Sequence, residues 1–232
     1  MRGHRQNYSN RRRIQEKPVK ECVKYEHGFF RGEKCQFCEE EGEMIMSPRH
    51  VDKFGRIMAG ILRHFPDRFD LEMSQQGWID VGEFVNAIKE KRGGLVYLTI
   101  KHVKAVIETD PKGRYQFEDN RIRATYAHSI DLDLDLPTEG VPEHLYYACS
   151  EDDVEDYIEN GLFPEDRMMV HLSGTRLNAL EAGRHIIGKP VVLMLDVREA
   201  EKDGGKIMKA GTTVFVTKEV VGKHLKRLPN ST

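Results

Sequence analysis

Four cysteine and histidine residues near the N-terminus have the types and the spacing of a zinc site. Cys35 and Cys38 form a CxxC pair, and Cys22 and His27 precede it in a Cys-x4-His arrangement. Thiolate and imidazole groups are the preferred ligands of tetrahedral zinc. A CxxC pair also serves redox chemistry, but it then opens a helix that follows a strand, and that context is missing here. We predict a structural zinc site formed by these four residues, with a metal-free cluster of buried cysteines as the alternative, and we expect no catalytic metal.

Two other chemically capable groups have ordinary structural explanations. Arg63-His64 combines a permanent cation with a side chain that titrates near neutral pH, so the pair can bind phosphate and transfer a proton. Basic residues at the end of a helix also stabilise the helix dipole and the free carbonyl groups there. Cys149 has the chemistry of a nucleophile, but no histidine and asparagine with a protease-like signature accompany it. We therefore interpret Cys149 as a small buried residue of a strand.

The charge of the chain is distributed unevenly. Its 232 residues carry 36 Lys and Arg against 38 Asp and Glu, a formal net charge of −2. Residues 1–20 hold seven of the basic residues and one acid, which leaves 29 basic and 37 acidic residues for the rest. We predict that residues 1–20 form a disordered basic arm, either a solvated tail or a contact to RNA phosphates. The near-neutral total therefore does not exclude a nucleic-acid partner.

Composition also limits the cellular setting. No stretch approaches the ~18–20 consecutive apolar residues that span a bilayer, and the N-terminus lacks the apolar core of a secretory signal. The four cysteines are too few for a disulfide framework. We expect a cytoplasmic protein that is a monomer and has no membrane partner.

The apolar pattern predicts three parts after the arm. Apolar residues recur with helical spacing behind Ser47-Pro48, Asp80 begins a second helix, and Thr99 caps a third. Residues 115–122 then alternate like a β-hairpin, and three helices followed by a two-stranded hairpin are the layout of a winged-helix module. The expected fold is therefore of the α+β class, with a zinc-binding knob at 21–46, a winged-helix lobe at 47–137 and a β-rich lobe at 138–232, and with helices over 48–65 and 80–92 and from 99 onward.

Shorter elements fill the rest of the chain. Residues 130–136 alternate Ile and Leu with Asp131, Asp133 and Asp135. Carboxylates at every second position of a strand are usually solvated, so we predict an exposed edge strand here rather than a metal site, followed by a linker over 137–142. Beyond it the pattern predicts strands over 145–147, 168–172 and 191–197, helices over 152–160 and 178–185, and a hairpin of 206–208 with 213–216.

A series of short motifs gives Arg63-His64 a wider setting. The series continues through Phe65-Pro66, Gly77-Trp78, Ile122-Arg123-Ala124, His128-Ser129, Gly161-Leu162, Arg167, Val170-His171-Leu172-Ser173, Ala182-Gly183-Arg184, Gly188-Lys189-Pro190-Val191-Val192-Leu193 and Lys209-Ala210-Gly211. In this order the set resembles the RNA (tRNA) 2′-phosphotransferase family, over roughly residues 48–228, and the cysteine-rich knob is similar to that of archaeal members. The resemblance implies a winged-helix RNA lobe and a C-terminal ADP-ribosyltransferase-like NAD lobe.

The same resemblance implies a reaction in two steps. The 2′-phosphate of an RNA attacks the nicotinamide riboside C1″ of NAD and expels nicotinamide. The ribose 2″-OH then attacks the phosphate, which yields RNA with a free 2′-OH and ADP-ribose 1″,2″-cyclic phosphate. The family's catalytic positions fall on Arg63, His64, Arg123 and Arg167. Guanidinium groups match phosphate oxygens bidentately, and an imidazole can transfer the proton of the 2″-OH or contact the phosphate.

The resemblance also implies binding residues for both substrates. RNA binding falls on Arg63, Arg123, His128 and Ser129. The family's NAD strand reads Leu-Tyr-His-Gly-Thr, whereas this chain has Leu145-Tyr146-Tyr147-Ala148-Cys149, and Tyr126-Ala127 stands where the family has Gln-Gly. The expected NAD-binding residues are Tyr147, Ala148, Cys149, Ser150, His171, Ser173 and Thr175.

Three functions stay open on this evidence. The first is the NAD-dependent 2′-phosphotransferase that acts on RNA of the tRNA splice-junction type. The second is an ADP-ribosyltransferase that caps a terminal phosphate of RNA or DNA and stops after the first step. The third is a non-catalytic nucleic-acid adaptor built from the zinc knob and the winged helix. The presence of all four basic positions favours the first, because binding alone does not require them together.

Overall fold

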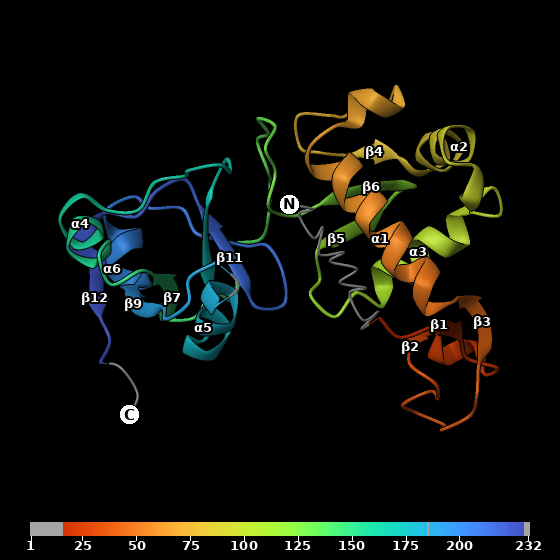
Figure 1. Cartoon of the computed structure of the whole chain (residues 1–232), viewed down its shortest axis with the longest axis horizontal. Helices are drawn as coiled ribbons and strands as arrows, with labels where there is room; N and C mark the ends of the chain where they lie inside the picture. Colours follow the sequence, from red (N-terminus) through yellow and green to blue (C-terminus); the bar gives the residue numbers. More distant parts are fainter. Residues whose placement is uncertain (1–15, 185, 230–232) are drawn as a thin grey trace, which may run out of the picture.

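Helix α1 (Pro48–Arg63) runs through the N-terminal half of the protein (Figure 1). The computed structural model describes residues 16–184 and 186–229. Ser47 has an extended backbone before α1, and Pro48 occupies the first turn, where its missing N–H has no cost. The apolar face of α1 is fully buried, and Phe54 meets Phe84 of helix α2 edge-on at 6.5 Å. The helix ends at Arg63 rather than at residue 65, because Phe65 folds back against Gly60.

Two more helices and a hairpin follow in the predicted order. Asp80 caps α2 (Val81–Lys91) by accepting the N–H groups of Gly82 and Glu83 at 2.7 and 3.0 Å. Thr99 precedes α3 (Ile100–Glu108). Strands β5 (Tyr115–Glu118) and β6 (Arg121–Ala124) form the hairpin, and β4 (Ile79–Asp80) pairs with β6 on its other side.

The hairpin turn shows why the prediction of its position was correct. Asp119 and Asn120 have φ values of 46° and 61°, so both turn residues are left-handed. Asp and Asn tolerate this conformation better than other residues with a side chain, and a left-handed pair matches the right-handed twist of the flanking strands.

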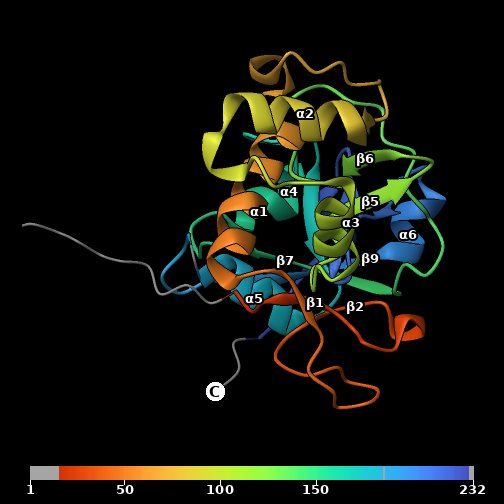
Figure 2. The ribbon, with the colours of Figure 1, turned by 90° about the vertical axis from the view of Figure 1, so that its right-hand side faces the viewer.

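The N-terminal knob is a small antiparallel sheet of strands β1 (Val19–Glu21), β2 (Phe29–Arg31) and β3 (Glu43–Met46), with β1 in the middle. Figure 2 shows the knob below α1 and α3. Val19 and Met46 are buried in the same core as Phe54. The predicted arm over 1–20 was therefore too long, because Val19 and Lys20 belong to a strand; its residues 1–15 lie outside the described part of the chain.

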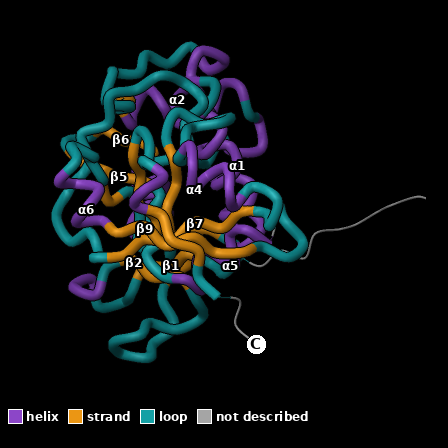
Figure 3. Tube along the Cα trace, turned by 90° about the vertical axis from the view of Figure 1, so that its left-hand side faces the viewer, coloured by secondary structure: helices purple, strands orange, loops and turns teal. Residues whose placement is uncertain are grey.

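The C-terminal half contains a six-stranded antiparallel sheet with its own core (Figure 3). Its strands, in the order β10-β11-β8-β7-β9-β12, are β10 (Met208–Lys209), β11 (Val214–Thr217), β8 (Val170–Ser173), β7 (His144–Cys149), β9 (Val191–Asp196) and β12 (Leu225–Arg227). The helices of this half are α4 (Val154–Asn160), α5 (Arg176–Arg184) and α6 (Val197–Lys202). Four single 3-10 turns complete the described elements: η1 (Tyr25–His27), η2 (Pro66–Phe69), η3 (Gly93–Leu95) and η4 (Gly222–His224).

The predicted edge strand over 130–136 was wrong. The alternation is real, since Leu134 and Leu136 are buried, but they pack in a small third core with Met208 and Val216 instead of joining a sheet. The backbone of Asp133 bonds to a loop carbonyl, that of Gln75, at 2.9 Å. This extended segment thus covers the junction between the two halves.

The two halves are also joined by short backbone links. Met168 N–H donates to the carbonyl of His128 at 3.2 Å, and Thr212 N–H donates to that of Lys112 at 3.1 Å. None of the described helices is both long and apolar enough to cross a membrane. The mixed α+β class predicted from the sequence is confirmed for residues 16–184 and 186–229.

Candidate active site

Arg63 and His64 lie where α1 stops at the junction of the halves. His64 N–H still bonds to the carbonyl of Gly60 at 3.0 Å, but its φ of −134° leaves the helix. Ser129 N–H donates to the carbonyl of Arg63 at 3.0 Å. The segment 126–129 therefore caps the helix end, so the helix carbonyl needs no basic side chain as a cap. This arrangement leaves both side chains available for other contacts.

The guanidinium of Arg63 is enclosed by aromatic rings. Its Cζ lies 4.9 Å from the centre of the Tyr126 ring and 5.7 Å from that of Tyr115. Its Nε and Nη2 are buried and have no hydrogen-bond partner. Burial lowers the pKa of Arg63, yet a guanidinium stays charged at any working pH. Arg63 thus holds buried donors that still lack an acceptor, which is costly unless a ligand supplies one.

His64 is exposed and is oriented by one neighbour. Its Nδ1 lies 2.9 Å from Ser129 Oγ. Partial burial, and after it the positive charges of Arg167 and Arg63, lower the pKa of His64 below its usual value. The ring is therefore neutral at pH 7 and can accept a proton through its free nitrogen.

Arg167 and His171 hold the segment of Ala127 from the other half. Arg167 Nη1 donates to the carbonyl of Ala127 at 2.9 Å, and Ala127 N–H donates to His171 Nε2 at 3.1 Å. Ala127 has a φ of 66°, in the left-handed region that costs a residue with a side chain about 1–2 kcal/mol. Two bonds from the C-terminal half therefore fix an unfavourable backbone conformation beside Arg63 and His64.

His128 supplies a further unpaired group at this place. Its side chain is only 4% exposed, and its Nε2 has no hydrogen-bond partner. Burial, and after it the charge of Arg63, lowers the pKa of His128 to about 4. The pKa of His171 is also lowered to about 4, first by burial and then by Arg167. Both rings are therefore neutral at neutral pH.

The two buried histidines should make the protein less stable in mild acid. A histidine in the unfolded chain has a pKa of about 6.5. Between pH 6.5 and pH 4, His128 and His171 are therefore protonated in the unfolded chain but not in the folded one. The free energy of unfolding should be at its full value above pH 6.5 and fall as the pH drops toward 4. Urea unfolding between pH 4.5 and 7.5 measures this slope. His128→Gln and His171→Gln should each lower the number of protons taken up on unfolding by about one and so reduce this slope. An unchanged slope in both variants would contradict the burial of neutral rings.

Arg123 is held by contacts within the protein, and its charge also helps to lower the pKa of His128. It is 4% exposed and packs 4.2 Å above the ring of Trp78. Its Nε donates to Gln116 Oε1 at 2.6 Å, and its Nη1 donates to the carbonyl of Gln76 at 3.0 Å and to Asp135. The carboxylates predicted to be solvated thus include one that binds Arg123, and this contact lowers the pKa of Asp135.

Replacing Arg123 with alanine should lower the free energy of unfolding by about 2–4 kcal/mol. The loss comes from two acceptors left without a donor and from the cation above Trp78. Asp135→Ala removes only an exposed carboxylate and should cost at most about 1 kcal/mol. Urea denaturation compares the two variants. Equal, small losses would mean that the guanidinium is not held by the protein.

The residues expected to bind NAD gather around one end of β7. Tyr147 meets Tyr157 edge-on at 5.7 Å, and Ala148 packs against Gly183 of α5, where a Cβ would come within 2.7 Å of the Ala148 side chain. Cys149 is buried, and burial raises the pKa of its thiol to about 11, which fits the interpretation as an inert strand residue.

The hydroxyl groups near β7 are engaged in local turns. Ser150 Oγ donates to Asp153 Oδ2 at 2.7 Å before α4, and Thr175 Oγ1 donates to Asn178 Oδ1 at 2.5 Å at the start of α5. Ser173 pairs with Tyr146 and Val214 across the sheet. The backbone groups of β7 remain unpaired on the side that faces β8, because within the described residues these strands pair only at Tyr146↔Ser173. The edge of Tyr147–Cys149 that faces β8 has no strand partner.

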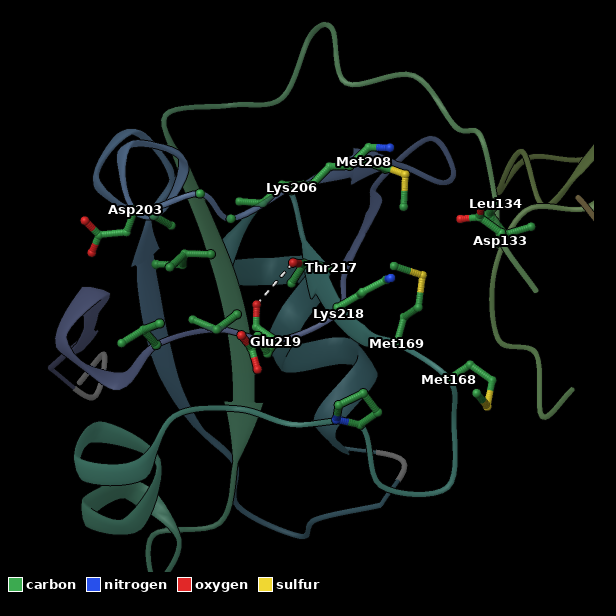
Figure 4. A pocket seen from close by; sticks show the side chains of 18 of the residues that line it. Asp133, Leu134, Met168, Met169, Asp203, Lys206, Met208, Thr217, Lys218 and Glu219 are labelled. Atoms are coloured by element: carbon green, nitrogen blue, oxygen red, sulfur yellow. Dashed lines mark hydrogen bonds between the residues drawn. The ribbon is translucent and has the colours of Figure 1, made fainter. Parts of the chain in front are cut away.

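A large cavity lies beside this site rather than in it. It has a volume of about 800 Å³ and lies between the segment 131–134 and the sheet of the C-terminal half, with Met168, Met169, Thr217 and Lys218 around it (Figure 4). A small hollow lined by His128 and His171 shares Met168 and Met169 with it. Of the predicted site residues, the larger cavity touches none.

The four predicted metal ligands come together in the knob. Cys22, His27, Cys35 and Cys38 place their ligand atoms within 4.8 Å of one another. Cys22 Sγ lies 3.4 Å from both His27 Nδ1 and Cys38 Sγ, and Cys35 Sγ lies 3.6 Å from His27 Nδ1. A zinc ion with bonds of about 2.0–2.3 Å to a tetrahedron of N and S atoms requires ligand separations of about 3.3–3.8 Å. The geometry and the donor set therefore fit this metal.

Sequence reasoning missed the groups that surround Arg63. Tyr115 was predicted as a hairpin residue and Tyr126 only as a departure from the family pattern, yet both rings enclose the guanidinium. No local signal marks Ala127 as left-handed, because alanine rarely adopts that conformation.

Comparison with known proteins shows the family of this chain. Residues 49–219 match the family described as RNA 2′-phosphotransferase, Tpt1/KptA family. A probable RNA 2′-phosphotransferase of Archaeoglobus fulgidus is 37% identical over 202 residues, which cover 87% of this chain and 92% of the relative. Proteins with the same description from Thermoplasma acidophilum and Methanosarcina barkeri are 34% and 32% identical and cover 86% and 89% of this chain, and 85% and 97% of their own lengths. This chain therefore belongs to the Tpt1/KptA family of RNA 2′-phosphotransferases, which are transferases.

Proposed function

We propose that the protein transfers the 2′-phosphate of an RNA to NAD. The observation that carries this proposal is a set of unpaired groups at the junction of the halves: Arg63 Nε and Nη2 and His128 Nε2 are buried without partners. Arg63 is charged, and the neutral His128 ring can carry a proton on Nε2. A phosphate has oxygen atoms that can accept from all three groups, and its negative charge can pair with the guanidinium of Arg63. His64 lies next to them and can act as the proton acceptor.

The two steps assign different tasks to these residues. In the first, the RNA 2′-phosphate attacks C1″ of the nicotinamide ribose and nicotinamide leaves with the bonding electrons. In the second, the 2″-OH attacks the phosphorus, the RNA 2′-oxygen leaves and takes up a proton, and the cyclic phosphate forms. Arg63 and Arg167 stabilise the charge on the phosphate oxygens, and His64 accepts the proton of the 2″-OH.

Two features support an NAD site at β7. The unpaired edge of Tyr147–Cys149 offers main-chain groups that can bind the carboxamide of nicotinamide. Because Gly183 has no side chain, α5 packs closely against Ala148 of β7 and supports the strand there. Ser150 and Thr175 keep their hydroxyl groups for turns, and His171 Nε2 already accepts the N–H of Ala127, so we assign the recognition to the main chain and to Ser173.

We also propose that the N-terminal half is a winged-helix RNA lobe. Helices α1–α3 are followed by the hairpin β5-β6, which supports this proposal, and we propose that the antiparallel six-stranded sheet of the C-terminal half forms the ADP-ribosyltransferase-like NAD lobe. We further propose that the Cys22, His27, Cys35 and Cys38 cluster binds one structural zinc ion and that Arg123 supports the RNA lobe from beneath the site.

One assay tests the function. An RNA with one internal 2′-phosphate is incubated with NAD, and phosphate loss, nicotinamide and ADP-ribosylated RNA are followed together. We expect equal amounts of dephosphorylated RNA and nicotinamide, and no reaction without NAD or with an RNA that carries a 3′-phosphate. A stable ADP-ribosylated RNA as the final product would favour the capping activity, and bound but unchanged RNA would favour the adaptor.

A further inference from the structure

The guanidinium groups of two arginines beyond the site lie over phenylalanine rings. Arg68 Cζ lies 5.0 Å from the centre of the Phe65 ring, and Arg92 Cζ lies 5.5 Å from that of Phe69. Both arginines are exposed. Stacking on a ring fixes the plane of a guanidinium and leaves its N–H groups at the edge free for an acceptor.

Neither arginine has an anionic partner within residues 16–184 and 186–229. The neighbouring cation differs, since Lys91 is paired with Asp70 and donates to the carbonyl of Arg68 at 3.0 Å. Asp67, Glu72 and Glu90 belong to the same segments, but they form no ion pair with Arg68 or Arg92. Lys91 therefore ties η2 to α2, while the two arginines remain available.

The arginines continue directly from the proposed active site. The His64 ring lies 6.3 Å from the Phe65 ring, on which Arg68 stacks. Phe69 follows Arg68 in η2, and its ring carries Arg92 from the end of α2. The groups thus follow one another from His64 over Phe65 to Arg68, and from Phe69 to Arg92, where the Lys91 contact joins η2 to α2.

We infer that Arg68 and Arg92 bind the phosphates of the RNA strand on one side of the 2′-phosphorylated nucleotide. A single strand repeats a phosphate and a base at each nucleotide, and its partners elsewhere combine cations with aromatic rings in this way. The inference rests on the proposed RNA substrate and extends it: these arginines act on flanking nucleotides and not on the reacting phosphate. The protein then prefers RNA that extends beyond the modified nucleotide.

Fluorescence anisotropy with labelled single-stranded RNA tests this surface without relying on activity. Arg68→Ala and Arg92→Ala should each weaken binding of a long strand about 5–10-fold. Each should also reduce the slope of log K against log salt concentration by about 0.7. Arg68→Lys keeps the charge but loses the stacked plane, so it should bind with intermediate strength. Arg198→Ala is the control. Arg198 lies on α6, is exposed and is paired with Glu143, so its replacement should leave RNA binding unchanged.

Substrate length gives the second readout. With a 2′-phosphorylated dinucleotide the Arg68 and Arg92 variants should match the wild type, whereas with a long 2′-phosphorylated RNA their KM should rise about 5–10-fold at an unchanged kcat. Equal losses on both substrates, or an unchanged salt slope, would overturn the inference. An inactive wild type that still binds RNA through these arginines would overturn the proposed reaction and leave this surface supported.

Discussion

Arg167→Ala is expected to reduce formation of the cyclic phosphate product about 10²–10³-fold and to make ADP-ribosylated RNA accumulate. In the proposed first step the phosphate acts as a nucleophile that already carries its charge, so loss of one cation slows the step modestly. In the second step charge builds up on the phosphate oxygens as the 2″-OH adds to phosphorus. Removing a fixed donor at that point costs about 10²–10³ in rate. Quenched-flow analysis of labelled RNA measures the intermediate directly.

A matched variant separates this effect from a structural one. Arg167 Nη1 also holds the carbonyl of Ala127, and His171 accepts the N–H of the same residue. His171→Ala therefore removes a comparable tether without removing a cation. It should slow the overall reaction without a build-up of ADP-ribosylated RNA. If Arg167→Ala behaves like His171→Ala, Arg167 is a positioning residue for the segment at Ala127 and does not contact the phosphate.

Local chemistry explains which elements could be predicted from the sequence. The Asp80 cap and the hairpin that turns at Asp119-Asn120 depend on residues within a few positions of each other, and the helix start and the hairpin both occur where they were predicted. The segment 130–136 has the alternation of a strand, but strand formation needs a partner edge elsewhere in the chain. Its leucines instead pack with Met208 and Val216, which lie about 80 residues away, and alternation alone cannot distinguish the two outcomes.

The candidate site shows the same limit at the level of side chains. The resemblance carried Arg63, His64, Arg123 and Arg167 as one set, since it concerns residue identities. The structure brings three of them together and holds Arg123 against Trp78. The contacts that decide this, to Gln116, Gln76 and Asp135, involve no family motif quoted for the chain. By contrast, the four residues of the Cys/His cluster were predicted as a set because CxxC spacing constrains geometry locally.

Metal removal should destabilise the whole N-terminal half and not only the knob. Cys22 follows β1 directly, and β3 begins five residues after Cys38, so the proposed metal would fix both strands. Val19 of β1 and Met46 of β3 are 0% and 1% exposed and belong to the same core as Phe54. Losing the burial of these two side chains costs about 3–6 kcal/mol in total. Chelation should release about one zinc ion per chain and lower the free energy of unfolding by at least that amount.

Single cysteine variants make the assignment specific. Cys38→Ser should lower zinc content and thermal stability together, because a hydroxyl is a poor zinc ligand. Cys149→Ser changes the one cysteine outside the cluster and should keep the full zinc content. The metal and the reaction are also separable, since the cluster lies in the knob and the site lies at the other end of α1. At 1.5 Å per residue, the 16 residues of α1 give this helix a length of about 24 Å. If the metal-free protein keeps its stability, the cysteines are only a packed cluster. If it loses stability while each folded molecule keeps its reaction rate, the zinc is structural.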